Sequence, residues 1–151
     1  ESVIPLLDNP TEEIHDAVYA EVTYHAAYEP KRAVRTPRYK YIRHFDDFNT
    51  TVMPNCDDGY AKSVLVEKGW CDCCVAEEYL YDLTFDPNEA HNIAEIPEMK
   101  DILEEMRSRL HRWMVETDDP ILRGLPVKAP KGAVINPQEQ TSPNEATVTV
   151  E

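Results

Sequence analysis

The sequence predicts an α+β fold: a small antiparallel sheet of about four strands, packed against one long C-terminal helix and followed by an extended tail. Short segments rich in β-branched and aromatic residues, separated by proline and asparagine turns, predict the strands. One late apolar stripe at three- and four-residue steps predicts the helix. A length of 151 residues allows one domain with a core and is too short for two substantial ones.

Composition divides the chain into three parts. Residues 1–16 combine a short apolar segment with the Asp8-Asn9-Pro10 stop, which is typical of a helix end and a polar connection. Residues 17–124 contain all the predicted elements of the domain. Residues 125–151 contain four prolines and no helical or convincing strand period, so we expect a tail that is ordered only where it lies on something else.

The strands are indicated by runs that turn residues interrupt. Pro37 separates two of them, because proline cannot donate to a central ladder. The polar step Glu29–Arg32 is expected to be a turn. The predicted strands are residues 17–24, 33–36, 39–43 and 78–84.

Two helices are expected. Residues 61–68 form a short one that Gly69 ends. The long helix begins near Pro97, which suits a first helical turn, and ends before Asp118-Asp119-Pro120. Its apolar stripe predicts a side that covers one face of the sheet, formed by Met99, Ile102, Leu103, Met106, Leu110, Trp113 and Met114.

The charge and hydropathy of the chain exclude several partners. A formal net charge of −14 argues against non-specific binding to nucleic acid or to anionic membrane surfaces, because both are polyanions. No apolar run approaches the roughly 18 to 20 residues that span a bilayer. The first eight residues also lack the basic start and long apolar stretch of a signal peptide.

The four cysteines, Cys56, Cys71, Cys73 and Cys74, favour reduced thiols over disulfides. Three of them fall within four residues, and the adjacent pair cannot easily bridge each other. Reduced thiols favour a cytoplasmic location. The alternative is a zinc site, for which Cys71 and Cys74 have half of the usual spacing. The sequence offers no second ligand pair beside them, so we expect no metal site in this chain.

Several short runs, taken in order, carry a resemblance to a known family. The runs are Glu21-Val-Thr-Tyr-His25, residues 28–36, 38–42, 54–58, 78–89 and 92–94, Trp113-Met114, and Thr117-Asp-Asp-Pro120. With these runs the chain resembles the C-terminal domain of sulfatases of the heparan N-sulfatase (sulfamidase) type, and the similarity covers roughly residues 1–135.

The resemblance implies a two-part enzyme. Its N-terminal α/β domain would hold calcium and a formylglycine, made from Cys or Ser in a C/S-x-P-x-R motif. Residues 1–16 would then be the end of that catalytic domain, which would be the partner of this one, and a sulfated sugar or another small sulfate ester would be the substrate. No cysteine here is followed by proline two positions later. The chain should therefore have no catalytic residue or cofactor of its own, and should be inactive alone.

The family's C-terminal domain borders the substrate pocket, which makes four residues of the first two strands candidates for substrate binding. His25 could donate to a sugar hydroxyl or a sulfate. The guanidinium groups of Arg32 and Arg35 could bind an anionic group with two donors, and Glu21, in the same run as His25, is the fourth candidate. The alternatives are a structural histidine and surface ion pairs.

The segment Asn55-Cys56-Asp57-Asp58 is the second candidate, because its polar residues lie on a predicted loop. Asn55 and Asp57 could contact the sugar. A self-bonded Asx turn is the alternative explanation.

Two other functions remain open from the sequence. The chain could be a free-standing, non-catalytic glycan-binding or structural module derived from the sulfatase family, or a zinc-stabilised acidic protein. If it is instead the C-terminal domain of a longer sulfatase, the side that packs on the catalytic domain should be exposed in isolation. We then expect the isolated chain to be soluble but prone to self-association.

Overall fold

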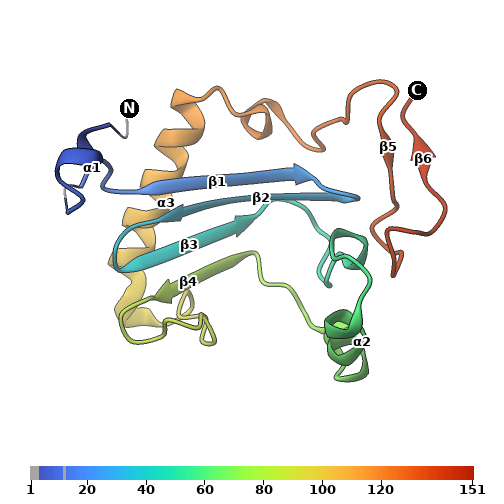
Figure 1. Ribbon diagram of the computed structural model, residues 1–151, viewed down its shortest axis with the longest axis horizontal. Coiled ribbons are helices and arrows are strands. Elements are labelled where there is room, and N and C mark those ends of the chain that lie inside the picture. The colour runs from blue at the N-terminus through green and yellow to red at the C-terminus, as the bar shows by residue number, and fades with distance from the viewer. Residues whose placement is uncertain (1–3, 12) are drawn as a thin grey trace.

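The structure is a computed structural model that describes residues 4–11 and 13–151 (Figure 1). Four antiparallel strands in sequence order form the main sheet, and a long helix crosses one of its faces. The strands are β1 Val18–Tyr24, β2 Tyr28–Arg35, β3 Tyr39–His44 and β4 Glu78–Asp82. This confirms the predicted α+β fold.

The long helix α3 spans Lys100–Glu116 and is preceded by a 3₁₀ turn, Pro97–Met99. The other helical elements are short: α1 Pro5–Asp8, α2 Tyr60–Glu67, and 3₁₀ turns at Met53–Asn55, Trp70–Asp72 and Pro120–Arg123. Gly69 follows α2 in the left-handed conformation, with φ 86°, as its predicted role requires. Among the described residues no helix is both long and apolar enough to cross a bilayer.

The core lies between the sheet and α3. Val34, Tyr41 and Leu80 are in register across β2, β3 and β4, so their side chains share one face. That face packs on the predicted apolar stripe of α3, which buries Leu103, Met106, Leu110 and Met114. At the edge of the sheet the ring of Tyr19 stacks on Trp113, with centroids 5.1 Å apart.

The turn predicted over Glu29–Arg32 is wrong, because β2 runs through these residues and the chain reverses earlier, at residues 25–27. The register explains how a strand accommodates Pro30. Two residues, Glu29 and Pro30, lie opposite Thr23 alone, because Val22 pairs with Lys31 and Tyr24 with Tyr28. A bulge of this kind is one of the few places in a sheet where proline is tolerated.

The tail is extended, as predicted, but it contains a short strand pair that the sequence did not indicate. β5 Val134–Ile135 pairs with β6 Val148–Thr149. The tail then lies against the β1–β2 turn, where Asn136 forms a parallel bridge with Ala27. Val3 of the apolar N-terminal segment lies outside the described residues, and the division into parts at residues 16 and 124 remains a prediction.

Candidate functional site

The side-chain amide of Asn55 hydrogen-bonds to the β1–β2 turn, residues 25–27. Asn55 Oδ1 accepts hydrogen bonds from the backbone N–H groups of Ala26 (2.9 Å) and Ala27 (2.7 Å). Its Nδ2 donates to the carbonyl of Ala27 (3.2 Å) and to Glu29 Oε2 (2.9 Å). Asn55 therefore bonds to a turn nearly thirty residues away rather than to its own backbone, and it fixes the turn that carries His25.

The tail supports the same turn from a second side. The backbone N–H of Asn136 donates to the carbonyl of Ala26 at 2.8 Å. Gln138 Nε2 donates to the carbonyl of Tyr28 and to Asp46 Oδ2, both at 2.8 Å. The imidazole of His25 remains exposed on this doubly supported turn. A supported turn with an exposed polar tip can present a hydrogen-bonding group to a ligand at low cost in ordering entropy.

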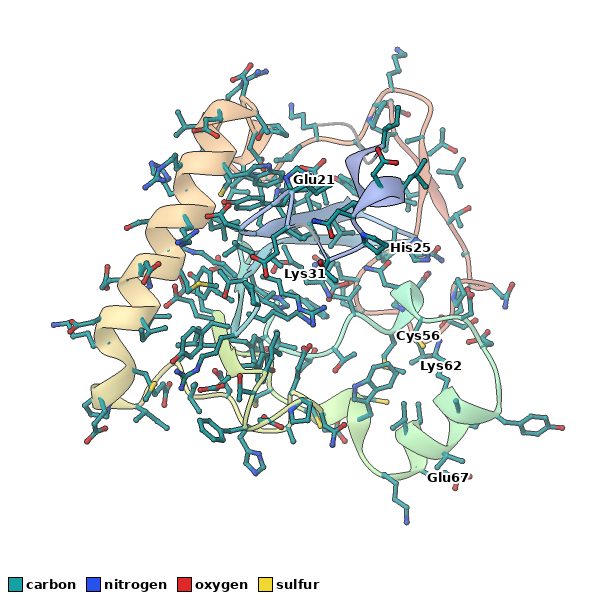
Figure 2. The ribbon with its side chains drawn as sticks, turned by 60° about the vertical axis from the view of Figure 1, so that its left-hand side comes forward. Glu21, His25, Lys31, Cys56, Lys62 and Glu67 are labelled. Carbon is teal, nitrogen blue, oxygen red and sulfur yellow. The ribbon has the colours of Figure 1, made fainter. Side chains whose placement is uncertain are left out.

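A buried lysine fixes the segment that follows Asn55. Lys62 Nζ donates to the carbonyls of Met53 (3.1 Å) and Cys56 (2.8 Å) and to Asp58 Oδ1 (2.8 Å). In Figure 2 it points from α2 back toward the segment that carries Cys56. Bonds from Lys62, Ser142 and Asn144 lower the pKa of Asp58 to about 2. Asp57, between these anchored residues, is exposed.

Arg32 is buried, with 1% of its surface exposed. Its Nε and Nη2 bond to the two carboxylate oxygens of Asp119, at 2.6 and 3.1 Å. The remaining donors bond to Val22 O, Lys31 O and Thr23 Oγ1. All five N–H donors of the guanidinium are thus engaged inside the fold. A direct contact with substrate would require Arg32 to give up one of these bonds.

Glu21 and Arg35 are exposed and separate from the turn. Glu21, which Figure 2 labels, pairs with Arg32 across β1 and β2, and its carboxylate lies 3.6 Å from the guanidinium. Arg35 ends β2 at the opposite end of the hairpin from His25. The structure therefore gathers His25, Asn55 and Asp57 at one end of the sheet and leaves Arg35 at the other.

The four cysteines are free, and Cys73 and Cys74 are exposed. Within residues 4–11 and 13–151 no three His, Cys, Asp or Glu side chains are grouped as metal ligands would be. The described part of the chain thus lacks the tetrahedral ligand set that the zinc alternative requires.

A cavity of about 390 Å³ lies where β3 ends, and it was not predicted from the sequence. Its polar lining includes Arg43, His44, Asp46, Asp47 and Glu77. Burial raises the pKa of Asp46 despite its hydrogen bond from Gln138. Burial, with a smaller effect of nearby Lys31, lowers the pKa of His44. His44 ends β3 and Asp46 follows it. Polar residues at and just past a strand end are the sequence signal that could have indicated a site here.

This end of the sheet can bind and orient a polar ligand. It offers an exposed imidazole, carboxylates, and the guanidinium of Arg43, whose Nε is buried without a hydrogen-bond partner among the described residues. None of these groups matches the nucleophile motif that the family resemblance implies. The arrangement is suited to recognition of hydroxyl-bearing or charged groups.

Comparison with known proteins identifies the relatives of this chain. It is 32% identical over 143 residues to an ulvan-active sulfatase of Formosa agariphila, an alignment that covers 87% of this chain and 28% of that protein. The homologues of this chain are sulfatases. Human N-sulphoglucosamine sulphohydrolase is 39% identical over 69 residues, which cover 44% of this chain and 13% of that enzyme. The sequence matches no protein-family model.

The solved structure of a sulfatase agrees with this. A 2-O GAG sulfatase superimposes with a TM-score of 0.56 and 26% identity over 86% of this chain and 22% of its own. A protein solved with D-glucosamine-2-N,6-O-disulfate shares the fold at a TM-score of 0.53 and 20% identity, over 79% of this chain and 20% of its own. The chain thus spans less than a third of the length of each of these four proteins.

Proposed function

We propose that this chain is the C-terminal domain of a formylglycine sulfatase, a sulfuric ester or sulfamate hydrolase, and that it borders the substrate pocket without supplying the nucleophile. The observation that carries the proposal is the 32% identity to the ulvan-active sulfatase, which extends over 87% of this chain. Calcium and formylglycine would belong to the remainder of the polypeptide, together with the chemistry of sulfate transfer.

The supported turn is the part of this domain that we assign to the substrate. His25 is exposed at the end of the sheet where the polar cavity opens, and Asn55 and the tail bond to the backbone of the two residues that follow it. Its imidazole would donate a hydrogen bond to a hydroxyl or sulfate of a sulfated sugar. Relatives that act on ulvan and on N-sulphoglucosamine support this substrate class.

Two measurements of sulfate release test the assignment. One uses the full polypeptide that the gene of this chain encodes, and the other uses the isolated 151-residue chain. We expect release from a sulfated oligosaccharide by the full polypeptide only. A reading frame without a C/S-x-P-x-R motif, or turnover by the isolated chain, would overturn the assignment.

The role of the turn has its own test in the full polypeptide. Loss of a hydrogen bond to a charged group corresponds to roughly ten-fold or more in binding, so His25→Ala should raise KM by about that factor. His91→Ala is the matched control, because His91 is also exposed but follows β4. An unchanged KM for His25→Ala would remove the turn from the pocket while leaving the sulfatase assignment intact.

A further inference from the structure

Helix α2 has its charged and apolar sides reversed. Lys62 points inward and is only 6% exposed, with its ammonium group bonded to three oxygen atoms. Tyr60 is 95% exposed and Val64 is 55% exposed, and Leu65 and Val66 are exposed by 44% and 40%. A helix on a free protein surface normally turns its apolar residues inward. The outer side of α2 instead presents four large apolar side chains to solvent.

The face of the sheet opposite α3 shows the same feature. Ala33, Ile42 and Tyr79 are in register across β2, β3 and β4, one residue out of step with the core row, so they lie on the helix-free face. Val18 on β1 is exposed there too. An antiparallel sheet with one wet face normally alternates apolar with polar residues. This sheet has an apolar row on its helix-free face, with Lys31, Arg35 and Lys40 beside it.

The lysines on the helix-free face do not make it a charged surface. Lys31 Nζ lies 2.7 Å from Glu29 Oε1, and Lys40 Nζ lies 2.6 Å from Glu89 Oε2. Each ammonium group is therefore neutralised by a neighbouring carboxylate. A partner that packs here would meet these two lysines already paired, which lowers the cost of removing water from them, together with the exposed guanidinium of Arg35.

The helix-free sheet face and the segment that follows α2 border the same groove. It has a volume of about 350 Å³ and is lined on one side by Ile42 and Tyr79 of the sheet and on the other by Trp70 and Cys74, with Lys31 also in its lining. In Figure 1 α2 lies beyond those ends of the strands that are farther from α3. We call the helix-free sheet face, α2 and the 3₁₀ turn Trp70–Asp72 together the second face.

We propose that the second face is the surface on which the larger, catalytic part of the same sulfatase polypeptide packs. The inference rests on the proposed function and names the surface through which that function would be assembled. Nearly three quarters of the ulvan-active sulfatase has no counterpart in this chain, so a relative of ordinary length contains ample protein to cover the face. Four strands about 20 Å long and about 4.8 Å apart offer roughly 400 Å². With α2 added, the second face approaches the ~600 Å² and more of interfaces between domains.

Charge argues against a second copy of this chain as the occupant. Each chain has a formal net charge of −14, and two such chains would repel each other across a surface whose own lysines are already paired. The catalytic part of a sulfatase would be covalently attached, so it would act at a high effective concentration.

Hydroxyl-radical labelling of two exposed aromatic rings tests the inference. Tyr60 on α2 is 95% exposed and Phe85, after β4 and outside the second face, is 81% exposed. We expect both rings to be labelled rapidly in the isolated chain. In the full polypeptide of its gene, Tyr60 should be protected at least about ten-fold while Phe85 stays reactive. The labelling of the isolated chain is measured at low concentration, where copies do not associate. Equal labelling of Tyr60 in both proteins would overturn the proposal.

A matched pair of valines gives an independent measurement. Val64 on α2 and Val115 on α3 are 55% and 56% exposed, but only Val64 lies on the second face. Val64→Asp should lower the Tm of the full polypeptide by several degrees and leave the Tm of the isolated chain unchanged, whereas Val115→Asp should affect neither. Equal Tm values for the two full-length variants would contradict the interface. The proposed function fails separately, if the full polypeptide releases no sulfate.

Discussion

Arg32 in β2 and Asp119, just beyond α3, form a bidentate ion pair with Nε–Oδ2 and Nη2–Oδ1 distances of 2.6 and 3.1 Å. Both side chains are almost completely buried. Asp119 also accepts a hydrogen bond from the backbone N–H of Ile121, in the 3₁₀ turn Pro120–Arg123 that follows the helix. The pair therefore joins the end of α3 to the sheet across nearly ninety residues of sequence.

The first prediction concerns the loss of this pair. Arg32→Met should lower the free energy of unfolding by about 3–5 kcal/mol, because it leaves the carboxylate of Asp119 buried without its cation. Arg35→Met, on an exposed arginine of the same strand, should change it by less than about 0.5 kcal/mol. Urea unfolding followed by circular dichroism measures both. A loss below about 1 kcal/mol for Arg32→Met would contradict the structural role of the pair.

The second prediction concerns pH and His44. Burial, with help from Lys31, lowers the pKa of His44 below its ordinary value of 6.5. The unfolded chain therefore binds a proton at a higher pH than the folded chain does, so stability should decline as the pH falls below about 6.5. His44→Gln should remove this part of the decline, and His91→Gln, on an exposed histidine, should not. Thermal unfolding between pH 8 and 5 measures the difference; identical slopes for wild type and His44→Gln would refute it.

The long helix was predictable because its signal is local and repeated: seven apolar residues between Met99 and Met114 recur at helical spacing, and four of them are buried. The strands were predictable for the same reason. The course of β2 through residues 29–32 was not predictable, because proline usually ends a strand. Only the register against β1 reveals the bulge that accommodates Pro30.

The site was less predictable, because its contacts join segments far apart in sequence. His25 and Asp57 could be named as polar residues at a strand end and in a loop. Nothing in the local sequence indicated that Asn55 would bond to the β1–β2 turn. The same is true of Asp119, which accepts hydrogen bonds from both Nε and Nη2 of Arg32. Such pairings depend on the tertiary fold, which composition and periodicity do not encode.

The third prediction concerns the attachment of the tail through Asp58. Hydrogen bonds from Lys62, Ser142 and Asn144 lower its pKa to about 2. Because the pKa is depressed, this attachment is fully present above the ordinary value of 3.8 and is lost as the pH falls toward 2. Asp58→Asn should speed hydrogen exchange in residues 142–146 at pH 7, and Asp57→Asn, on an exposed neighbour, should not. Unchanged exchange in Asp58→Asn would show that the tail is held elsewhere.

The fourth prediction isolates the amide that supports the β1–β2 turn. Asn55→Ala removes two bonds to backbone N–H groups and two bonds from Nδ2, and should lower the free energy of unfolding by about 2 kcal/mol. The amides of Ala26 and Ala27 should then exchange hydrogen at least ten-fold faster, because they lose their acceptor. Asn49→Ala is the control, since Asn49 is exposed and lies in the neighbouring loop. If Asn55→Ala destabilised the chain without faster exchange at Ala26 and Ala27, the amide would act on the loop around Met53 and not on the turn. The support proposed for His25 would then have to come from Asn136 and Gln138 alone.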